Sequence, residues 1–185
     1  MSECHFYWTS PPDEINSPEN YAGFSERSDY LLRVLPRYVN KTDSILELGC
    51  NVGRNLEALW GADYHNIQGV DINPRALELS KDLYPHMKAQ LYHDIIEDFI
   101  KTCPVYDCIF TLAVLMHLPD DDTIKLIESK VGRVLITIED ECTDGVFHFA
   151  RNYKRLFTGL QQIHTEKVNF IPPGLTTRVF VRGAL

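Results

Sequence analysis

The decisive stretch of the chain is Ser44-Ile45-Leu46-Glu47-Leu48-Gly49-Cys50-Asn51-Val52-Gly53. An apolar strand ends there in an acidic residue and a glycine turn, where backbone can approach a ligand closely as a helix begins. A second strand ends in Asp71, about 20 residues later, where a ribose-hydroxyl acceptor stands in a doubly wound α/β sheet. The pattern predicts a nucleotide-cofactor site.

The composition of this turn indicates which cofactor it holds. The dinucleotide fingerprint G-x-G-x-x-G is absent, and Glu47 stands two residues before Gly49. A carboxylate at that place repels a pyrophosphate, whereas it tolerates a sulfonium cofactor that carries an α-ammonium group. The turn therefore favours S-adenosylmethionine.

On these residues the chain resembles the class I S-adenosylmethionine-dependent methyltransferases of the small, single-domain, small-molecule type. The likeness spans roughly residues 40 to 140. Residues 45–53 resemble the family's first motif, an acid-x-Gly-x-Gly-x-Gly turn around the methionine part of the cofactor. Asn51 replaces the middle glycine, and asparagine enters left-handed conformations readily. The resemblance assigns this contact to Glu47, Gly49, Cys50 (through its backbone), Asn51 and Gly53.

Three further motifs of the family follow in the same order and spacing. The resemblance implies that Asp71 takes both ribose hydroxyls and that Ile72 packs on the adenine. Asp94 would accept from the adenine amino group, while the backbone N–H of Ile95 serves a ring nitrogen. Residues 106–112 and residues 116–119 resemble the fourth strand and the loop that faces the transferring methyl, and the resemblance makes Thr111 a candidate contact of the cofactor.

The segment before the first strand, residues 1–40, is predicted to be an arm and a helix that cap the pocket. Phe6-Tyr7-Trp8 followed by Pro11-Pro12 predicts an irregular aromatic arm. A helix follows from the Ser17 N-cap and ends near Pro36. By resemblance, Tyr21 and Arg27 are candidates to hold the carboxylate of the cofactor; the alternative is a helix packed on the sheet with Arg27 in solvent.

From residue 41 to 185, strand-like and helix-like runs alternate, which predicts right-handed crossovers and a parallel sheet covered on both faces. We expect strands near 45–49, 66–71, 89–94, 105–111 and 133–139. Helices are expected after Asn73-Pro74 and Pro119-Asp120 and over 147–158, and strands over 161–169 and 176–181. The resemblance implies a doubly wound, mostly parallel, Rossmann-like sheet of seven strands with an antiparallel last strand, within one compact domain.

Size and charge limit the partners. With 185 residues, the chain can bury one substantial core. A net charge of −8 argues against an extended nucleic acid as substrate. No apolar run is long enough to span a bilayer, and the first five residues do not resemble a secretory signal. We expect a cytoplasmic protein with free cysteines and a small-molecule substrate; the sequence leaves its oligomeric state open.

Methyl transfer is an in-line displacement, so a base is needed only if the acceptor must lose a proton. His117, after the fourth strand, is the candidate base, and the alternative is a structural hydrogen bond. Glu139, His148, Arg151 and Tyr153 are candidates to contact the acceptor, against simpler roles in a solvated loop and a helix start. No metal ligand set is expected. The D-P-P-Y type sequence of methyltransferases that act on planar nitrogen is missing, which leaves oxygen, aliphatic nitrogen, sulfur or carbon as the acceptor atom.

Other functions stay open from the sequence. One is a non-methylating enzyme, such as an aminopropyl transferase, with the same type of cofactor. Another is a catalytically silent cofactor-binding module whose aromatic arm, residues 6–8, engages a protein partner. A nicotinamide oxidoreductase ranks last.

Overall fold

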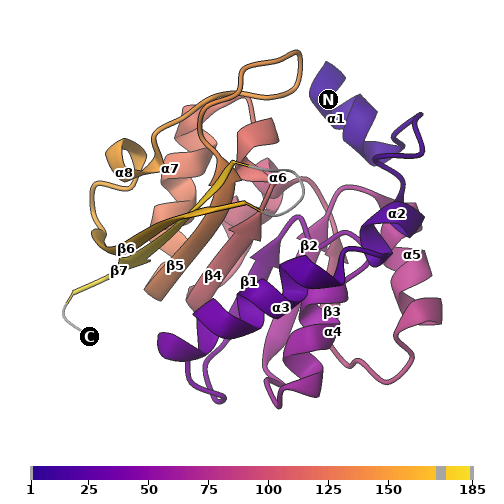
Figure 1. Ribbon diagram of the computed structural model, residues 1–185, viewed down its shortest axis with the longest axis horizontal. Helices are drawn as coiled ribbons and strands as arrows, with labels where there is room; N and C mark the ends of the chain where they lie inside the picture. The colour runs from indigo at the N-terminus through magenta and orange to yellow at the C-terminus, as the bar shows by residue number, and fades with distance from the viewer. Residues whose placement is uncertain (1, 170–173, 184–185) are drawn as a thin grey trace.

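The structure is a computed structural model that describes residues 2–169 and 174–183. In this part of the chain, one sheet has the strand order β3-β2-β1-β4-β5-β7-β6 (Figure 1). Strands β1 to β5 are parallel, and β7 runs antiparallel to both β5 and β6, as expected. The strands are β1 (Ile45–Leu48), β2 (Ile67–Asp71), β3 (Gln90–His93), β4 (Tyr106–Leu112), β5 (Val131–Asp140), β6 (Gln161–Val168) and β7 (Leu175–Val181).

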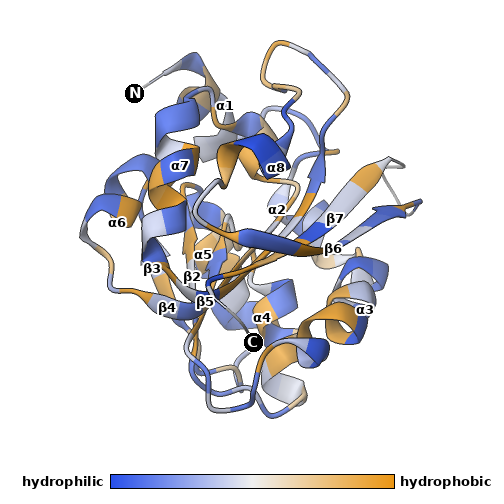
Figure 2. Cartoon of the chain, turned by 90° about the vertical axis from the view of Figure 1, so that its left-hand side faces the viewer, coloured by the Kyte–Doolittle hydropathy of each residue, from blue (hydrophilic) through white to orange (hydrophobic). Residues whose placement is uncertain are grey.

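Helices cover both faces of this sheet (Figure 2). One face carries α3 (Ser25–Val34), the short 3-10 helix η1 (Leu35–Arg37), α4 (Arg54–Gly61) and α5 (Pro74–Leu83). The other carries α6 (Ile96–Thr102), α7 (Asp121–Lys130) and α8 (Tyr153–Leu156). At the carboxyl ends of the strands lie α1 (Glu3–Thr9), α2 (Pro18–Ala22) and the 3-10 helix η2 (Leu115–His117) (Figure 1).

The period-two alternation of strand side chains produces two apolar cores. Ile45 and Phe110 pack under α3 and α4, whereas Leu46 and Ile109 pack under α6 and α7, and all four are fully buried. Because both faces of the sheet are covered, the central strands read as nearly continuous apolar runs. Glu47 is the exception in β1, and it lies where the sheet meets the cofactor turn.

Two local predictions are wrong. Residues 3–9 form α1 rather than an irregular arm, because the Ser2 side chain caps the helix and Pro11-Pro12 follow its C-cap, Ser10. The helix expected over 147–158 shrinks to α8, because the chain before it makes a bridge between Gly145 and His148 and is anchored to neighbouring loops. Strand β6 ends at Val168, so Asn169, the last residue of the strand expected over 161–169, lies outside it.

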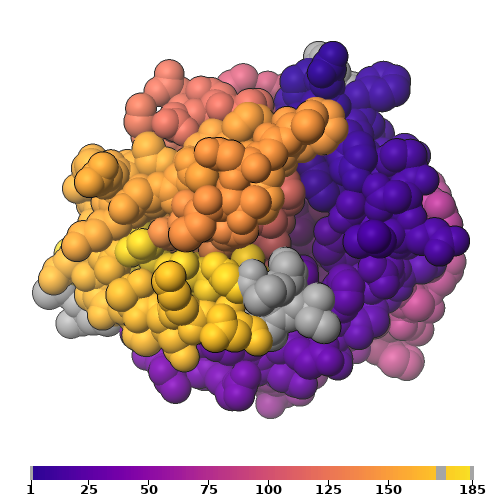
Figure 3. Space-filling model, turned by 45° about the horizontal axis from the view of Figure 1, so that its top comes forward, coloured from indigo at the N-terminus to yellow at the C-terminus, as the bar shows by residue number. Residues whose placement is uncertain are grey.

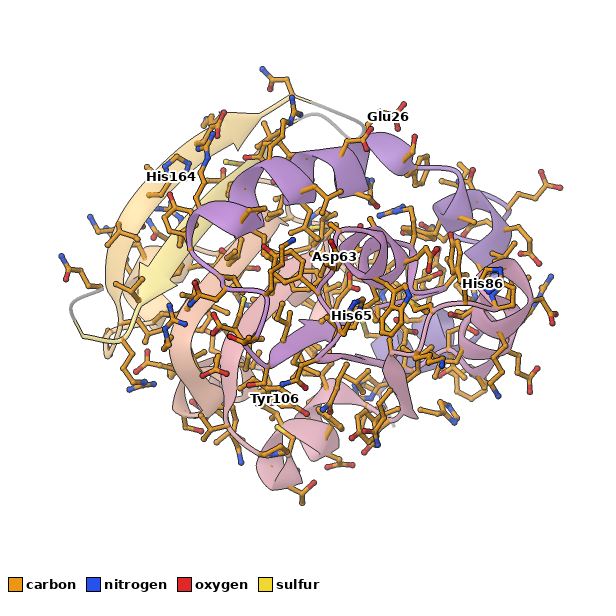
Figure 4. The ribbon with its side chains drawn as sticks, turned by 90° about the horizontal axis from the view of Figure 1, so that it is seen from below. Glu26, Asp63, His65, His86, Tyr106 and His164 are labelled. Atoms are coloured by element: carbon orange, nitrogen blue, oxygen red, sulfur yellow. The ribbon has the colours of Figure 1, made fainter. Side chains whose placement is uncertain are left out.

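The cavity does not extend to the amino-terminal ends of the strands. Seen from below in Figure 4, Asp63, His65 and Tyr106 lie at the amino-terminal ends of the strands, and none of the three lines the cavity described next. Among the helices of the described residues, none has the length and apolar content needed to cross a bilayer.

Candidate functional site

Left-handed backbone shapes the turn between β1 and α4. Gly49, Asn51 and Gly53 have φ values of 70°, 49° and 74°. Asn51 takes the left-handed conformation at the middle position, as expected because asparagine tolerates left-handed backbone better than most residues. A Cβ atom at Gly49 would lie 2.4 Å from a methyl carbon of Val114, so the backbone here approaches the loop after β4 too closely for any side chain.

The carboxylate of Asp71 ties the ends of β1 and β2 together. Its Oδ2 accepts from the backbone N–H of Asn51 at 2.7 Å, and its Oδ1 accepts from that of Asn73 at 2.8 Å. Burial raises the pKa of Asp71, and these two backbone hydrogen bonds oppose the rise. Each oxygen retains a lone pair, so Asp71 can still accept two hydroxyl groups.

Glu47 is a buried carboxyl with one satisfied oxygen. Oε1 accepts from Nδ2 of Asn55 at 2.7 Å, whereas Oε2 has no hydrogen-bond partner among the described residues. Burial raises the pKa of Glu47 to about 8. A cationic ligand group placed beside Oε2 would satisfy it and favour the ionised form.

Arg54, the first residue of α4, joins this carboxyl to the N-terminal helices. Its Nε donates to Oγ of Ser28 at 3.0 Å, its Nη1 to the carbonyl of Tyr21 at 2.6 Å, and its Nη2 to Oδ1 of Asn55 at 3.1 Å. Ser28 in turn donates to the same Asn55 oxygen at 2.8 Å. One network of side chains therefore orients Glu47 and holds α2 and α3 on the cofactor turn.

A cavity of about 990 Å³, counted with its opening, lies at the carboxyl ends of the strands. The N-terminal segment forms one wall, and Figure 3 shows the surface hollowed between that segment and the segment that follows β5. Most of the predicted cofactor residues line this cavity together with the candidate base: Tyr21, Arg27, Glu47, Gly49, Cys50, Asn51, Asp71, Ile72, Ile95 and His117.

Helix α1 closes the cavity on one side. Cys4 donates through Sγ to the carbonyl of His117 at 3.0 Å, and His5 Nε2 lies 2.8 Å from Oε1 of Glu97. The Trp8 ring packs on the His117 ring with centroids 4.4 Å apart. These contacts make the aromatic arm part of the site.

His117 has a defined tautomer. Its Nδ1 lies 2.6 Å from the carbonyl oxygen of Phe147 and must carry the hydrogen, because a carbonyl oxygen only accepts. Nε2 is then the unprotonated nitrogen, and it makes no hydrogen bond to the described residues. Burial lowers the pKa of His117 to about 4, with a further lowering from His148. The imidazole is therefore neutral near pH 7.

Glu139 braces the loop after β4. Its Oε1 accepts from Oγ1 of Thr111 at 2.7 Å, and its Oε2 accepts from the backbone N–H groups of Val114 at 2.9 Å and Met116 at 3.3 Å. These contacts hold Ala113 at a φ of 57°, which is unusual for a residue with a side chain. Glu139 and Thr111 are fully buried and lie behind the cavity wall.

The other predicted contacts to the acceptor also lie outside the cavity lining. Arg151 donates through Nε to Oδ1 of Asp121 at 2.6 Å. Tyr153 is fully buried in the core under α7, and its hydroxyl has no partner among the described residues. His148 lies near His117, with ring centroids 5.4 Å apart.

Besides Thr111, two predicted cofactor residues, Gly53 and Asp94, lie outside the lining. Gly53 is the N-cap of α4, and Asp94 accepts through Oδ1 from the backbone N–H of Ile95 at 2.8 Å. Sequence reasoning missed several lining residues, among them Trp8, Asn55 and Leu118. Asn55 could have been found from its place in the first turn of the helix that follows the glycine turn. The role of Trp8 depends on long-range packing.

Comparison with known proteins agrees with this geometry. Residues 45–135 match a family described as a methyltransferase domain. The chain is 29% identical over 133 residues to the methyltransferase adrK of Penicillium rubens, covering 62% of this chain and 47% of that protein. It thus spans about half the length of the curated relative that it matches.

Solved structures share the fold across nearly the whole chain. Magnesium protoporphyrin IX methyltransferase (ChlM) from Synechocystis PCC 6803 with bound SAM has a TM-score of 0.76 and 14% identity and covers 99% of both chains. The N-methyltransferase NodS from Bradyrhizobium japonicum WM9, in complex with S-adenosyl-L-homocysteine, has a TM-score of 0.70 and 18% identity over 96% of this chain and 92% of its own. Residues 45–135 thus form a methyltransferase domain, and the chain has the fold of these methyltransferases, which were solved with S-adenosylmethionine or S-adenosyl-L-homocysteine bound.

Proposed function

We propose that this protein transfers the methyl group of S-adenosylmethionine to a small-molecule acceptor. The observation that carries the proposal is the pair of buried carboxyl groups, Glu47 and Asp71, at the tips of neighbouring strands and in the wall of one cavity. The unpartnered Oε2 of Glu47 fits the ammonium group of the cofactor. The net charge of −8 supports a small acceptor over an extended nucleic acid.

The chain's own residues would bind and orient the two reactants. Asp71 would accept from the ribose hydroxyls, Ile72 would pack on the adenine, and the backbone N–H of Ile95 would serve a ring nitrogen. Tyr21 and Arg27 would hold the carboxylate. The bound cofactor supplies an electrophilic methyl group. Closure by α1 excludes water from the reacting atoms, and alignment of this kind can supply much of the rate.

Asp71→Asn tests the cofactor assignment. The amide keeps one acceptor oxygen but loses the charge and turns the other position into a donor, so S-adenosylhomocysteine should bind about 10- to 100-fold more weakly, corresponding to about 1–3 kcal/mol. Titration calorimetry measures the affinity. Asp82→Asn, at an exposed position on α5, is the matched control and should bind as the unmodified protein does.

Equal affinity in Asp71→Asn and the control would contradict the assignment. Product mass separates methyl transfer from aminopropyl transfer, because the two add different groups to the acceptor. The silent-module alternative has less support in this structure: of the arm residues 6–8, Trp8 lines the cavity, and Phe6, with 78% exposure, is left for a partner.

A further inference from the structure

The lining residues that the proposed function does not assign to the cofactor are mostly apolar. They come from α1 and the chain after it and from the end of β4 and the loop that follows: Cys4, Trp8, Pro11, Leu112, Val114 and Leu118. Such a wall favours an acceptor with a large apolar surface, because removing apolar surface from water is favourable.

The charged groups of this wall are already paired. His5 and Glu97 face each other at 2.8 Å. Arg54 donates through Nε, Nη1 and Nη2 to three protein oxygens. Arg27 also lines the cavity, and the proposed function assigns it to the cofactor carboxylate.

Two arginines that follow β5 in the chain, Arg151 and Arg178, are engaged by carboxylates outside the cavity lining. Arg151 contacts Asp121, and Arg178 makes a two-pronged contact to Glu141 with distances of 2.6 and 2.7 Å. Among the described residues, the wall around the acceptor therefore offers no spare cation to an anionic acceptor. One oxygen of the Glu97 carboxylate likewise already accepts from His5, which leaves less of it to a cationic acceptor. Charged acceptors would lose hydration there and gain at most a shared partner.

His117 adds one polar feature to this wall. With the Nδ1 hydrogen held by Phe147, the lone pair of Nε2 can accept a single proton from a bound acceptor. This nitrogen suits an acceptor whose methylated atom carries a hydrogen.

We infer that the acceptor is an uncharged, mainly apolar hydroxyl compound that is methylated on oxygen, an inference that rests on the proposed function. The acceptor oxygen forms the bond to the methyl carbon, and its proton passes to Nε2 of His117. The electron pair of the broken carbon–sulfur bond stays on sulfur, so the positive charge moves from sulfonium to imidazolium, which returns its proton to solvent.

The test compares three matched probes: 4-propylphenol, 4-propylbenzoate and 4-propylbenzylamine. Binding of S-adenosylhomocysteine is measured first, since its failure would refute the proposed function itself. Each probe is then titrated into the loaded protein, and its methylation by labelled cofactor is followed by product mass. The phenol should bind at least 10-fold more tightly than the acid and the amine, and it should gain one methyl on oxygen.

Substitutions test whether the charge of the lining, and not its apolar surface alone, decides which probe binds. Pro11→Lys places a cation in the wall and should improve binding of 4-propylbenzoate at least 10-fold, whereas Ile15→Lys, at a position 74% exposed and outside the lining, should not. His117→Gln should bind S-adenosylhomocysteine and the phenol normally while losing at least 10-fold in turnover.

Any of four results would overturn the inference while leaving cofactor binding intact. They are preferred binding of the acid, preferred binding of the amine, no binding of the phenol to the loaded protein, and undiminished phenol turnover by His117→Gln.

Discussion

Gly49 illustrates how one missing side chain fixes the site. Gly49→Ala combines a left-handed φ of 70° with a contact to Val114 that is shorter than atoms allow. The conformation costs about 1–2 kcal/mol and the overpacking about 1–3 kcal/mol. We expect the free energy of unfolding, measured by urea denaturation, to fall by the sum.

A double-mutant cycle separates the two costs. Val114→Ala in the Gly49→Ala background should recover the overpacking part and leave the conformational part. Gly61→Ala, where the added Cβ meets nothing within 4 Å, is the control and should leave stability unchanged or slightly higher. Strict additivity of the two substitutions would show that Gly49 and Val114 do not share this space.

Single residues of the cofactor turn could be predicted because their signals are local. Asn51 and Asp71 lie within one strand-turn-helix unit whose geometry follows from glycine spacing and strand ends. Glu139 was expected to face the acceptor because it ends a parallel strand. It instead points into the loop after β4, whose three donors are the nearest partners for a buried carboxyl.

At the scale of elements, Arg54 fastens α2 and α3 to α4. Arg54→Met removes three hydrogen bonds from a buried network and leaves their acceptors unpaired, so the free energy of unfolding should fall by about 2–4 kcal/mol. Cofactor affinity should fall with it, because Asn55 and Glu47 lose their support.

Arg75→Met is the matched control, since its exposed ion pair with Glu19 should contribute about 0–1 kcal/mol. Urea denaturation and calorimetry compare the two variants. Equal effects of the two substitutions would mean that the Arg54 network has no role in holding the site.

Elements with strong apolar periodicity were predicted well. Helix α1 was not, in spite of its Ser2 cap, and neither was the segment that tertiary contacts hold. The Asn73 cap and Pro74 mark the start of α5, and β1 to β5 fall within a few residues of the predicted runs. The segment over 147–152 contains helix-compatible residues, yet Phe149 donates its N–H to Met116 and the segment stays irregular. Propensity could not reveal that partner.

For the whole molecule, His117 links stability to pH. Its pKa falls from 6.5 to about 4 on folding, so the unfolded chain binds the proton more tightly between these values. Its contribution is complete above pH 6.5 and is lost as the pH falls toward 4, with a total of up to about 3 kcal/mol.

Urea denaturation between pH 4.5 and 7 checks this effect. Glu47 and Glu139, whose pKa values burial raises to about 8 and about 7, change stability in the opposite direction as the pH rises. The informative quantity is therefore the difference from His117→Gln, which should shrink as the pH falls. His86→Gln, at an exposed position, should show a constant difference. A pH-independent difference for His117→Gln would refute the linkage.

The attachment of α1 has a consequence for the order of assembly. Its anchors, Glu97 and His117, stand 92 and 113 residues further along the chain than His5 and Cys4. Contacts this distant in sequence form late during folding, and a short terminal helix detaches at little cost in local fluctuations. We therefore expect molecules in which α1 has detached to bind the cofactor still but to discriminate less among acceptors. On heating, selectivity among acceptors should decline before cofactor affinity does.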